Sequence, residues 1–234
     1  MAKHGKKYLA AVKLLEGVKT CDLSEAAALL KKTAVTKFDS SCEIHLRLGV
    51  DPTHAEQMVR STVSLPHGTG KTVRVIAFVG EDKIKEAKAA GAIKAGMEEL
   101  IDEVAKGFLD FDMAVATPDA MKNLGKVAKI LGPKGLMPNP KAGTVTMDIG
   151  KAIGEISKGR VEFRTDKLAR IHQIFGKASF SEEQIMENLK AFIRAVLDVK
   201  PSSVKGNYIQ NISVATTMGP GIRLDLQKVM AELK

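Results

Sequence analysis

The segment Gly68-Thr69-Gly70-Lys71-Thr72 has residue types that could bind phosphate, because a glycine-rich loop followed by lysine can surround it. The full phosphate-loop pattern needs glycine where Leu65 stands, and a helix must begin directly after the loop. Instead an apolar run, residues 73–80, follows and predicts a strand. We therefore interpret the segment as a linker, with a nucleotide-binding enzyme as the alternative.

Other catalytic patterns are missing from the sequence. Glu81 and Asp82 follow the first apolar strand where a dinucleotide fingerprint would place glycines, and acidic residues there would repel a phosphate. Cys21 and Cys42 form no metal-binding pair and fit a reducing compartment. His45 has no accompanying metal ligand, so we interpret it as a solvated side chain. The sequence predicts no enzyme, no metal site and no cofactor.

The charge of the chain favours a polyanionic partner. The 234 residues include 36 Lys and Arg against 27 Asp and Glu, which gives a net charge of +9. Such an excess binds phosphates with release of counterions. Hydrophobic residues make up 44% of the chain, enough for a packed core. We expect an amphipathic helix over 8–18 rather than a signal peptide, no membrane partner, and a cytoplasmic protein.

The two ends of the chain share one kind of pattern. Residues 42–48 and 161–164 alternate between apolar and polar, which predicts half-buried strands. Capping-box spacings predict a helix after Asp22 and another over 181–197. A last strand is expected over 208–215. Both ends therefore predict one α+β domain, formed by residues 1–67 and 157–234.

The middle of the chain has a different pattern and predicts an inserted domain, residues 68–156. Apolar strands alternate with helices, which is typical of a Rossmann-like α/β fold with a parallel sheet. The insert carries 13 basic and 12 acidic residues, whereas the flanks carry 23 and 15, so we expect the split domain to be the main polyanion surface. The expected elements are strands over 73–80, 91–96 and 113–116, a helix rich in lysine, glutamate and alanine between the first two strands, and helices over 97–106 and 118–130.

A loop rich in proline and glycine, residues 131–141, fixes a rigid backbone path and suggests a site or a docking surface. Together with Ile130 this string closely resembles the signature of the bacterial ribosomal protein L-one family. Further blocks in the order of that family are Thr36-Lys37-Phe38, Val161–Lys167, Ile171-His172, Gly176–Phe180 and Thr216–Gly219.

The resemblance implies a split α+β domain with an inserted Rossmann-like domain, and a monomer when free. It also implies a constituent of the large ribosomal subunit that binds large-subunit ribosomal RNA, forms the mobile stalk and helps deacylated tRNA leave the exit site. The protein would then lie in the cytoplasm, on the ribosome. Repression of its own operon mRNA is implied as well, and a free RNA-binding regulator is the alternative reading.

The same resemblance places RNA contacts mainly on the split domain. Lysines could reach phosphates, Thr217 offers a hydroxyl, Met218 an adaptable apolar face and Gly219 close backbone approach. Aromatic residues make up only 4% of the chain, so recognition of RNA shape and phosphates is expected. Core packing is the alternative for Phe38, and a solvated charge for Lys177. The candidate RNA-binding residues are Lys37, Phe38, Arg164, Lys167, His172, Lys177, Ser179, Thr217, Met218 and Gly219.

Two positions depart from the family pattern. Ala169 stands in a turn where glycine is usual, so we expect that turn to differ. Phe175 stands where an aliphatic residue is usual, which changes the packing expected before Gly176.

Overall fold

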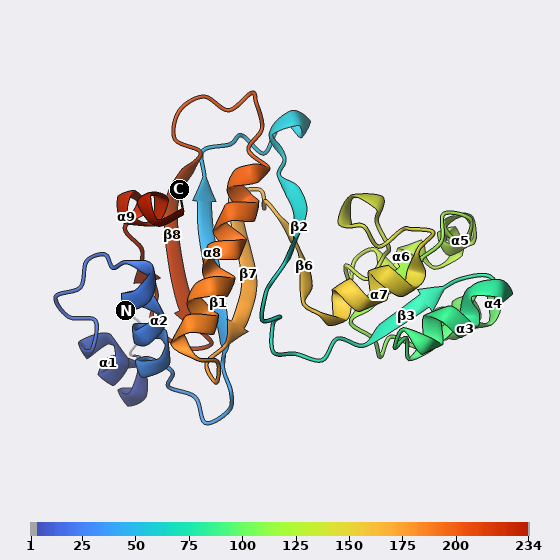
Figure 1. The fold of residues 1–234 in the computed structure, drawn as a ribbon, viewed down its shortest axis with the longest axis horizontal. Helices are drawn as coiled ribbons and strands as arrows, with labels where there is room; N and C mark the ends of the chain where they lie inside the picture. Colours follow the sequence, from blue (N-terminus) through green and yellow to red (C-terminus); the bar gives the residue numbers. More distant parts are fainter. Residues whose placement is uncertain (1–3, 234) are drawn as a thin grey trace. The chain divides into compact units, whose positions relative to one another are not determined.

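A computed structural model describes residues 4–233, except the side chains of Ala55 and Lys141. The chain forms two compact units (Figure 1). The split unit contains the chain up to Gly70 and again from Val161, and the insert is Lys71–Arg160. With these limits the insert carries 15 basic and 12 acidic residues and the split unit 21 and 15. The contrast in charge is therefore smaller than the one expected from the sequence.

The split unit is built from both ends of the chain. Its centre is an antiparallel sheet in the order β7-β1-β8-β9, next to a two-stranded sheet of β2 and β6. The elements are α1 (Lys6–Lys13), α2 (Leu23–Lys32), β1 (Ser41–Leu48), η1 (Ala55–Gln57), β2 (Arg60–Ser64), β6 (Arg160–Arg164), β7 (Arg170–Lys177), α8 (Glu182–Asp198), β8 (Ile209–Thr216), β9 (Ile222–Arg223) and α9 (Leu226–Leu233).

Strand β1 follows the predicted alternation. Its side chains at Cys42, Ile44, Leu46 and Leu48 are buried, and those between them are more exposed. Residues opposite one another in antiparallel strands lie on the same face. One face of the sheet therefore points into the core, and the other carries the polar residues.

Helices α2 and α8 cover the core face. The predicted capping boxes are present: Asp22 accepts from the N–H of Glu25, and Ser181 accepts from that of Gln184. Phe175 is fully buried in this core, so the aromatic ring is accommodated there. Asn188 of α8 is buried too, and it bonds to His67, Gly68 and the carbonyl of Phe175. One amide thus ties the start of the linker to the sheet.

The C-terminal end holds two elements that the sequence analysis missed. Strand β9 pairs with β8 after the turn at 217–221, and α9 follows. The apolar residues of α9 recur at helical spacing, which was a usable signal. They are Leu226, Val229, Met230 and Leu233.

The insert is a three-layer α/β unit, which confirms the predicted fold class. Its parallel sheet has the order β4-β3-β5. Along β3, Ile76 and Phe78 join one hydrophobic cluster, whereas Val75 and Ala77 join the other. Both faces of the sheet are therefore covered by helices. The elements are β3 (Val75–Phe78), α3 (Glu81–Ala89), β4 (Lys94–Gly96), α4 (Glu98–Ala105), β5 (Met113–Ala116), α5 (Ala120–Asn123), η2 (Leu124–Lys126), α6 (Ala128–Leu131), η3 (Pro140–Ala142) and α7 (Ile149–Ser157).

Two expected helices differ from the structure. The N-terminal helix is α1, which ends at Lys13 instead of residue 18. The single helix expected over 118–130 is wrong, because the chain forms α5, η2 and α6 in succession. Gly125 lies in the 3₁₀ turn, and glycine weakens a helix by about 1 kcal/mol relative to alanine. None of the helices within residues 4–233 is long and apolar enough to cross a bilayer.

Candidate nucleic-acid interface

Three segments far apart in the sequence meet at one end of the four-stranded sheet. Ser41 pairs with Lys177, and Cys42 pairs with Thr216. Because the strands are antiparallel, the segment that enters β1 lies beside those that leave β7 and β8. This sheet end therefore gathers six of the ten candidate residues, and Ser179 lies two residues after Lys177. The six are Lys37, Phe38, Lys177, Thr217, Met218 and Gly219.

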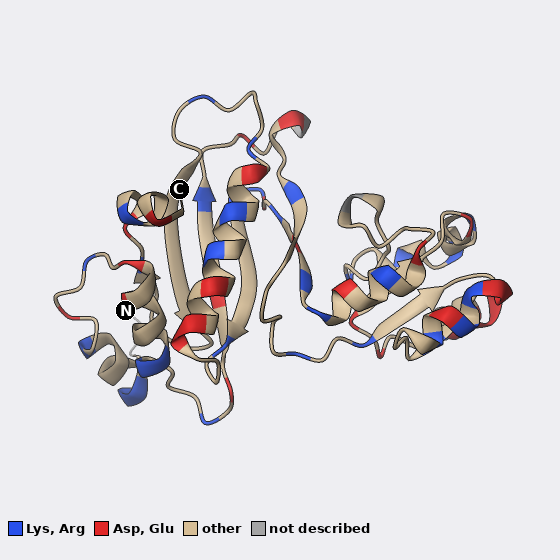
Figure 2. Cartoon of the chain, in the orientation of Figure 1, with Lys and Arg blue, Asp and Glu red and all other residues tan. Residues whose placement is uncertain are grey.

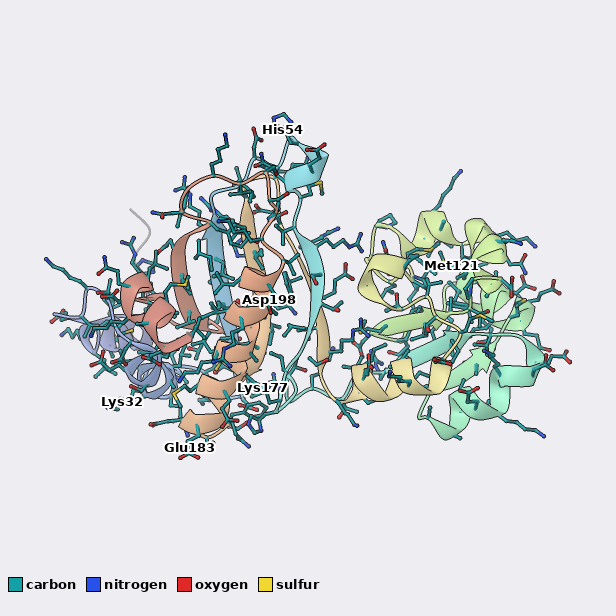
Figure 3. The ribbon with its side chains drawn as sticks, turned by 45° about the horizontal axis from the view of Figure 1, so that its top comes forward. Lys32, His54, Met121, Lys177, Glu183 and Asp198 are labelled. Carbon is teal, nitrogen blue, oxygen red and sulfur yellow. The ribbon has the colours of Figure 1, made fainter. Side chains whose placement is uncertain are left out.

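The loop before β1 is held by polar groups at the end of β7 and just after it. Asp39 accepts two hydrogen bonds from Ser179, from its N–H at 3.0 Å and its hydroxyl at 2.9 Å. Lys177 Nζ (Figure 3) donates to the Ser41 hydroxyl at 3.0 Å. Lys177 is therefore half-buried and engaged within the chain, rather than a freely solvated charge.

The turn after β8 is held in a similar way. The Thr217 hydroxyl accepts from the N–H of Ser41 at 3.1 Å and lies 3.3 Å from its carbonyl. A Cβ on Gly219 would lie 2.3 Å from Thr216 Oγ1. Contacts inside the chain therefore already require the small Gly219 and occupy the Thr217 hydroxyl, so that hydroxyl is not the free donor expected from the sequence.

The loop before β1 and the turn after β8 carry two exposed apolar side chains and one exposed cation. Phe38 is 62% exposed and Met218 is 74% exposed, so core packing is wrong for Phe38. Met218 has φ of +64°, a left-handed conformation that costs an L-residue about 1–2 kcal/mol. Lys37 is exposed and makes no ion pair within residues 4–233. Strain and exposed apolar surface at one place are typical of a binding site.

A pair of histidines occupies the polar face of the same sheet. His45 and His172 are opposite one another in β1 and β7, with their Nδ1 atoms 2.9 Å apart. Burial and the neighbouring His172 lower the pKa of His45, and Glu43 opposes this effect. His45 is therefore partly exposed, as expected of a residue on the polar face, and it also contacts a second imidazole that the sequence analysis did not predict. The two histidines meet because β1 and β7 pair in a particular register. That register cannot be derived from the sequence of either strand.

Three arginines lie on the same polar face of the sheet as the histidines. We call this face, which points away from the core, the open face. Arg47 pairs with Arg170 across β1 and β7, and Arg223 pairs with Ser213 across β9 and β8. All three arginines are exposed, and none makes an ion pair within the described part of the chain. The sequence analysis did not name them, although the alternation of β1 could have indicated Arg47.

The remaining candidates lie toward the opposite end of β7. Lys167 belongs to the turn before this strand, and Arg164 is exposed at the end of β6. The eight residues of β7 separate this turn from Lys177 by about 23 Å. The structure therefore distributes the predicted residues over a whole sheet face instead of one compact site.

The turn at Lys167 is built around one carboxylate. Burial would raise the pKa of Asp166, but the backbone N–H groups of Arg170 and Leu168 bind its Oδ1 at 2.8 Å each, and the pKa is lowered. Ala169 has φ of +58° where glycine is usual in the family it resembles. Ala169 therefore adopts a left-handed backbone conformation that glycine would adopt more easily.

The glycine-rich segment near Lys71 has a structural explanation. Lys71 Nζ lies 2.7 Å from Asp112 Oδ1, and this bond is the main cause that lowers the pKa of Asp112 to about 2. No helix follows Lys71, since the next element is β3. The lysine is thus committed to an ion pair within the insert, which argues against a phosphate loop.

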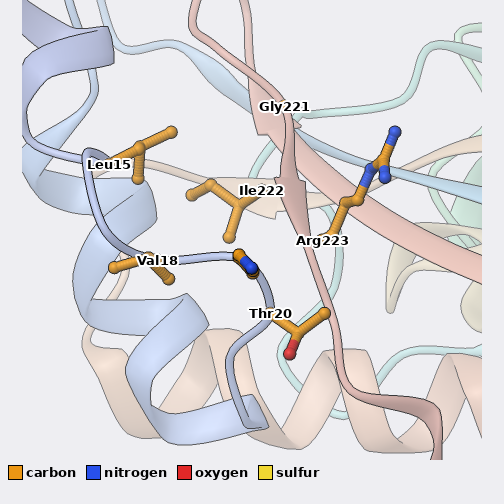
Figure 4. Close-up of a pocket in the computed structure, with 7 residues that line it drawn as sticks. Leu15, Val18, Thr20, Gly221, Ile222 and Arg223 are labelled. Carbon is orange, nitrogen blue, oxygen red and sulfur yellow. The ribbon is translucent and has the colours of Figure 1, made fainter.

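Two further features are the buried cysteines and a pocket near β9. Burial raises the pKa of Cys42 to about 12 and that of Cys21 to about 11, so neither thiol ionises near neutral pH. A pocket of about 450 Å³ opens near β9, but Figure 4 shows Arg223 directed away from its aliphatic side chains. The residues that line it are Leu15, Val18, Lys19, Thr20, Gly221, Ile222 and Arg223.

Known proteins are similar to this chain over nearly its whole length. Residues 30–220 match the model of the ribosomal protein L1p/L10e family. A protein of Fervidobacterium nodosum named large ribosomal subunit protein uL1 is 53% identical over 235 residues, covering all of both chains. Its namesake from Solidesulfovibrio magneticus is 53% identical over 98% of this chain and 97% of its own. The predicted resemblance is confirmed, and the chain belongs to the ribosomal protein L1p/L10e family.

Proposed function

We propose that the chain is a structural constituent of the large ribosomal subunit and binds its ribosomal RNA through the split unit. The contact surface would be the open face of the sheet β7-β1-β8-β9 together with its end at Phe38 and Met218. The observation that carries this proposal is the pair of strongly exposed apolar side chains, held in place by internal hydrogen bonds and bordered by unpaired cations.

Each part of this surface would have its own role. Lys37, Lys167 and the open-face arginines would pair with phosphates, which supplies affinity that falls with salt. Phe38 and Met218 would pack against a base or ribose that the RNA fold exposes. Lys177, Ser179 and Thr217 would act mainly as holders of the loop and turn that present them.

The experiment is a binding titration of the full chain with an in vitro transcript of large-subunit ribosomal RNA. Met218→Ala should weaken binding about tenfold, since burying a methionine side chain contributes about 1.5–3 kcal/mol. Met58→Ala is the matched control, because Met58 is 55% exposed in the same unit but outside the proposed surface. Equal affinities of the two variants would refute the surface, and binding no tighter than to unrelated RNA would refute the function.

The finer roles implied by the family belong to the same proposal. A repressor of its own operon mRNA would use the same surface, so messenger and ribosomal RNA would compete for the protein. A competition titration with both RNAs tests this proposal. Simultaneous binding of messenger and ribosomal RNA to one protein molecule would contradict it. Mobile-stalk movement and release of deacylated tRNA from the exit site rest on the family resemblance.

A further inference from the structure

Three methionines of the described part of the chain are strongly exposed, and Met218 is the most exposed of them. Its side chain is 74% exposed, whereas those of Met58 and Met147 are each 55% exposed. The other methionines between residues 4 and 233 are all less exposed. An oxidant in solution attacks a thioether that it can reach, so the sulfur of Met218 is the most accessible one.

The backbone on both sides of Met218 is fixed by hydrogen bonds. Before it, the N–H of Thr217 binds the carbonyl of Ser41 at 3.0 Å, and after it the N–H of Gly219 binds the carbonyl of Thr216 at 2.8 Å. Met218 itself has φ of +64°. The direction in which its side chain leaves the backbone is therefore set, and the sulfur stays open to solvent as long as the split unit is folded and has no partner at this place.

The two cysteines do not compete for the oxidant. Burial is the main cause that raises the pKa of Cys21 to about 11 and that of Cys42 to about 12. An oxidant attacks the thiolate rather than the thiol, and both side chains are also out of its reach in the core. Among the sulfur atoms of the described residues, those of the exposed methionines are therefore expected to react first.

The turn that carries Met218 has no charge of its own. Residues 217–221 are Thr-Met-Gly-Pro-Gly, whereas the loop that enters β1 carries residues of both signs (Figure 2). In the proposed RNA surface, Met218 thus contributes apolar contact, and Lys37 contributes the charge at this end of the sheet. A chemical change at the sulfur would alter the apolar contact and leave the net charge of the chain as it is.

We propose that Met218 is an oxidation site, at which a peroxide lowers the affinity of the free chain for ribosomal RNA. The thioether sulfur attacks one oxygen of hydrogen peroxide, the O–O bond breaks, and the sulfur–oxygen bond of a sulfoxide forms. The other oxygen leaves with both hydrogens as water, so the peroxide gains the two electrons that the sulfur loses. This inference rests on the proposed function, because it uses the proposed contact of Met218 with RNA.

A sulfoxide at Met218 opposes the contact that the thioether makes. Oxidation converts a flexible apolar side chain into a polar one with an acceptor oxygen. Packing this oxygen against the apolar face of a base or ribose removes its water without supplying a donor, which disfavours the complex. Bound RNA covers the sulfur, so the reaction is confined to the free chain. Methionine sulfoxide reductases reverse such an oxidation.

The first experiment measures where hydrogen peroxide reacts. The full chain is treated with dilute peroxide, with and without an excess of the ribosomal RNA transcript, and mass spectrometry of peptides follows the oxidation of each methionine. Met218 should react at least as fast as Met58 and Met147, and RNA should slow its reaction at least about fivefold while changing the other two less than about twofold. Equal protection of the three methionines, or a slower reaction at Met218 than at both others, would overturn the site.

The second experiment measures the RNA affinity of three chains before and after the same peroxide treatment. They are the parent chain, Met218→Leu, and a control chain with both Met58→Leu and Met147→Leu. Leucine has a similar volume and forms no sulfoxide. Treatment should weaken binding by the parent and the control about tenfold, whereas the affinity of Met218→Leu, whatever its starting value, should change less than about twofold. Thermal melts of all three chains check the fold.

Two measurements on the parent chain need no substitution. Because oxidation removes no cation, the salt slope of RNA binding should be the same before and after treatment. Methionine sulfoxide reductases should restore the lost affinity. An altered salt slope, no recovery with the reductases, or an equal loss of affinity in treated Met218→Leu would place the damage elsewhere and overturn the site.

Failure of the proposed function would look different. If the untreated chain binds ribosomal RNA no more tightly than unrelated RNA, the proposed function fails and the inference falls with it. If the untreated chain binds specifically and keeps its affinity once Met218 is oxidised, the proposed function stands and the oxidation site is wrong.

Discussion

The hydroxyl of Thr217 accepts a hydrogen bond from the backbone N–H of Ser41, 176 residues away in the sequence, at 3.1 Å. Thr217 in turn donates its own N–H to the Ser41 carbonyl at 3.0 Å. The turn that carries Met218 is therefore fastened to the first residue of β1. We therefore expect any substitution that removes the hydroxyl to act on the fold as well as on the proposed RNA binding.

Thr217→Ala should lower the free energy of unfolding by about 1–2 kcal/mol, because the N–H of Ser41 loses its partner. It should also weaken RNA binding, since Met218 loses its fixed position. Thr217→Ser keeps the hydroxyl and should restore both quantities. Chemical denaturation and RNA titration of the two variants measure this, and an alanine variant as stable as the parent chain would contradict it.

Ala169 should tolerate glycine and reject β-branched residues. Its φ of +58° is costly for any L-residue and most costly for valine. We expect Ala169→Val to destabilise the split unit by about 2 kcal/mol or more. Ala169→Gly should stay within about 1 kcal/mol, because relief of strain is offset by greater freedom of the unfolded chain. Thermal melts of the two variants measure their stability. A valine variant as stable as the parent chain would show that residue 169 does not have a positive φ.

The histidine pair should make stability depend on pH. The folded pKa of His45 lies below the ordinary value of 6.5, so the unfolded chain binds more protons near that pH. The contribution to stability is thus fully present above about pH 6.5 and is lost as the pH falls through the lower folded pKa. His45→Gln should flatten this dependence in denaturation midpoints from pH 7.5 to 5. His54→Gln, at a well-exposed position, serves as control, and equal profiles would exclude the effect.

The ion pair between Lys71 and Asp112 should stabilise the insert against acid. It should have no effect on the affinity for RNA. Asp112 has its pKa lowered to about 2, so its contribution is present above the ordinary value of 3.8 and is lost as the pH falls toward 2. Lys71→Gln should raise the pKa of Asp112, which NMR titration of its carboxyl group can measure. RNA affinity should change less than about twofold, and a loss of nucleotide turnover would reinstate a phosphate loop.

Patterns within single elements were predictable from the sequence. The alternation of β1, both capping boxes and the switch between α+β and α/β segments follow from local periodicity, and the fold class follows from them. The broken segment over 118–130 was missed because its apolar spacing resembles a continuous helix despite Gly125. Helix α9 was overlooked although its spacing was visible.

The candidate site was predictable in its residue types but not in its arrangement. Which face of β7 meets which residue of β1 depends on strand register, including the irregularity between Cys42 and Glu43. For that reason the contact of His45 with His172, and the bonds of Asp39 with Ser179, could not be derived from the sequence. Sequence blocks predicted which residues would bind RNA, whereas the structure separates the exposed candidates from those that hold the loop and the turn in place.

The central place of β1 has a consequence for synthesis of the chain. Both of its neighbours, β7 and β8, come more than 120 residues later in the sequence. The chain is synthesised from its N-terminal end, so β1 has no partner strand until the insert has been completed. Contacts between residues so far apart in the sequence form slowly. The insert, whose pairings are local, is thus expected to fold first, while the split unit waits for the last third of the chain.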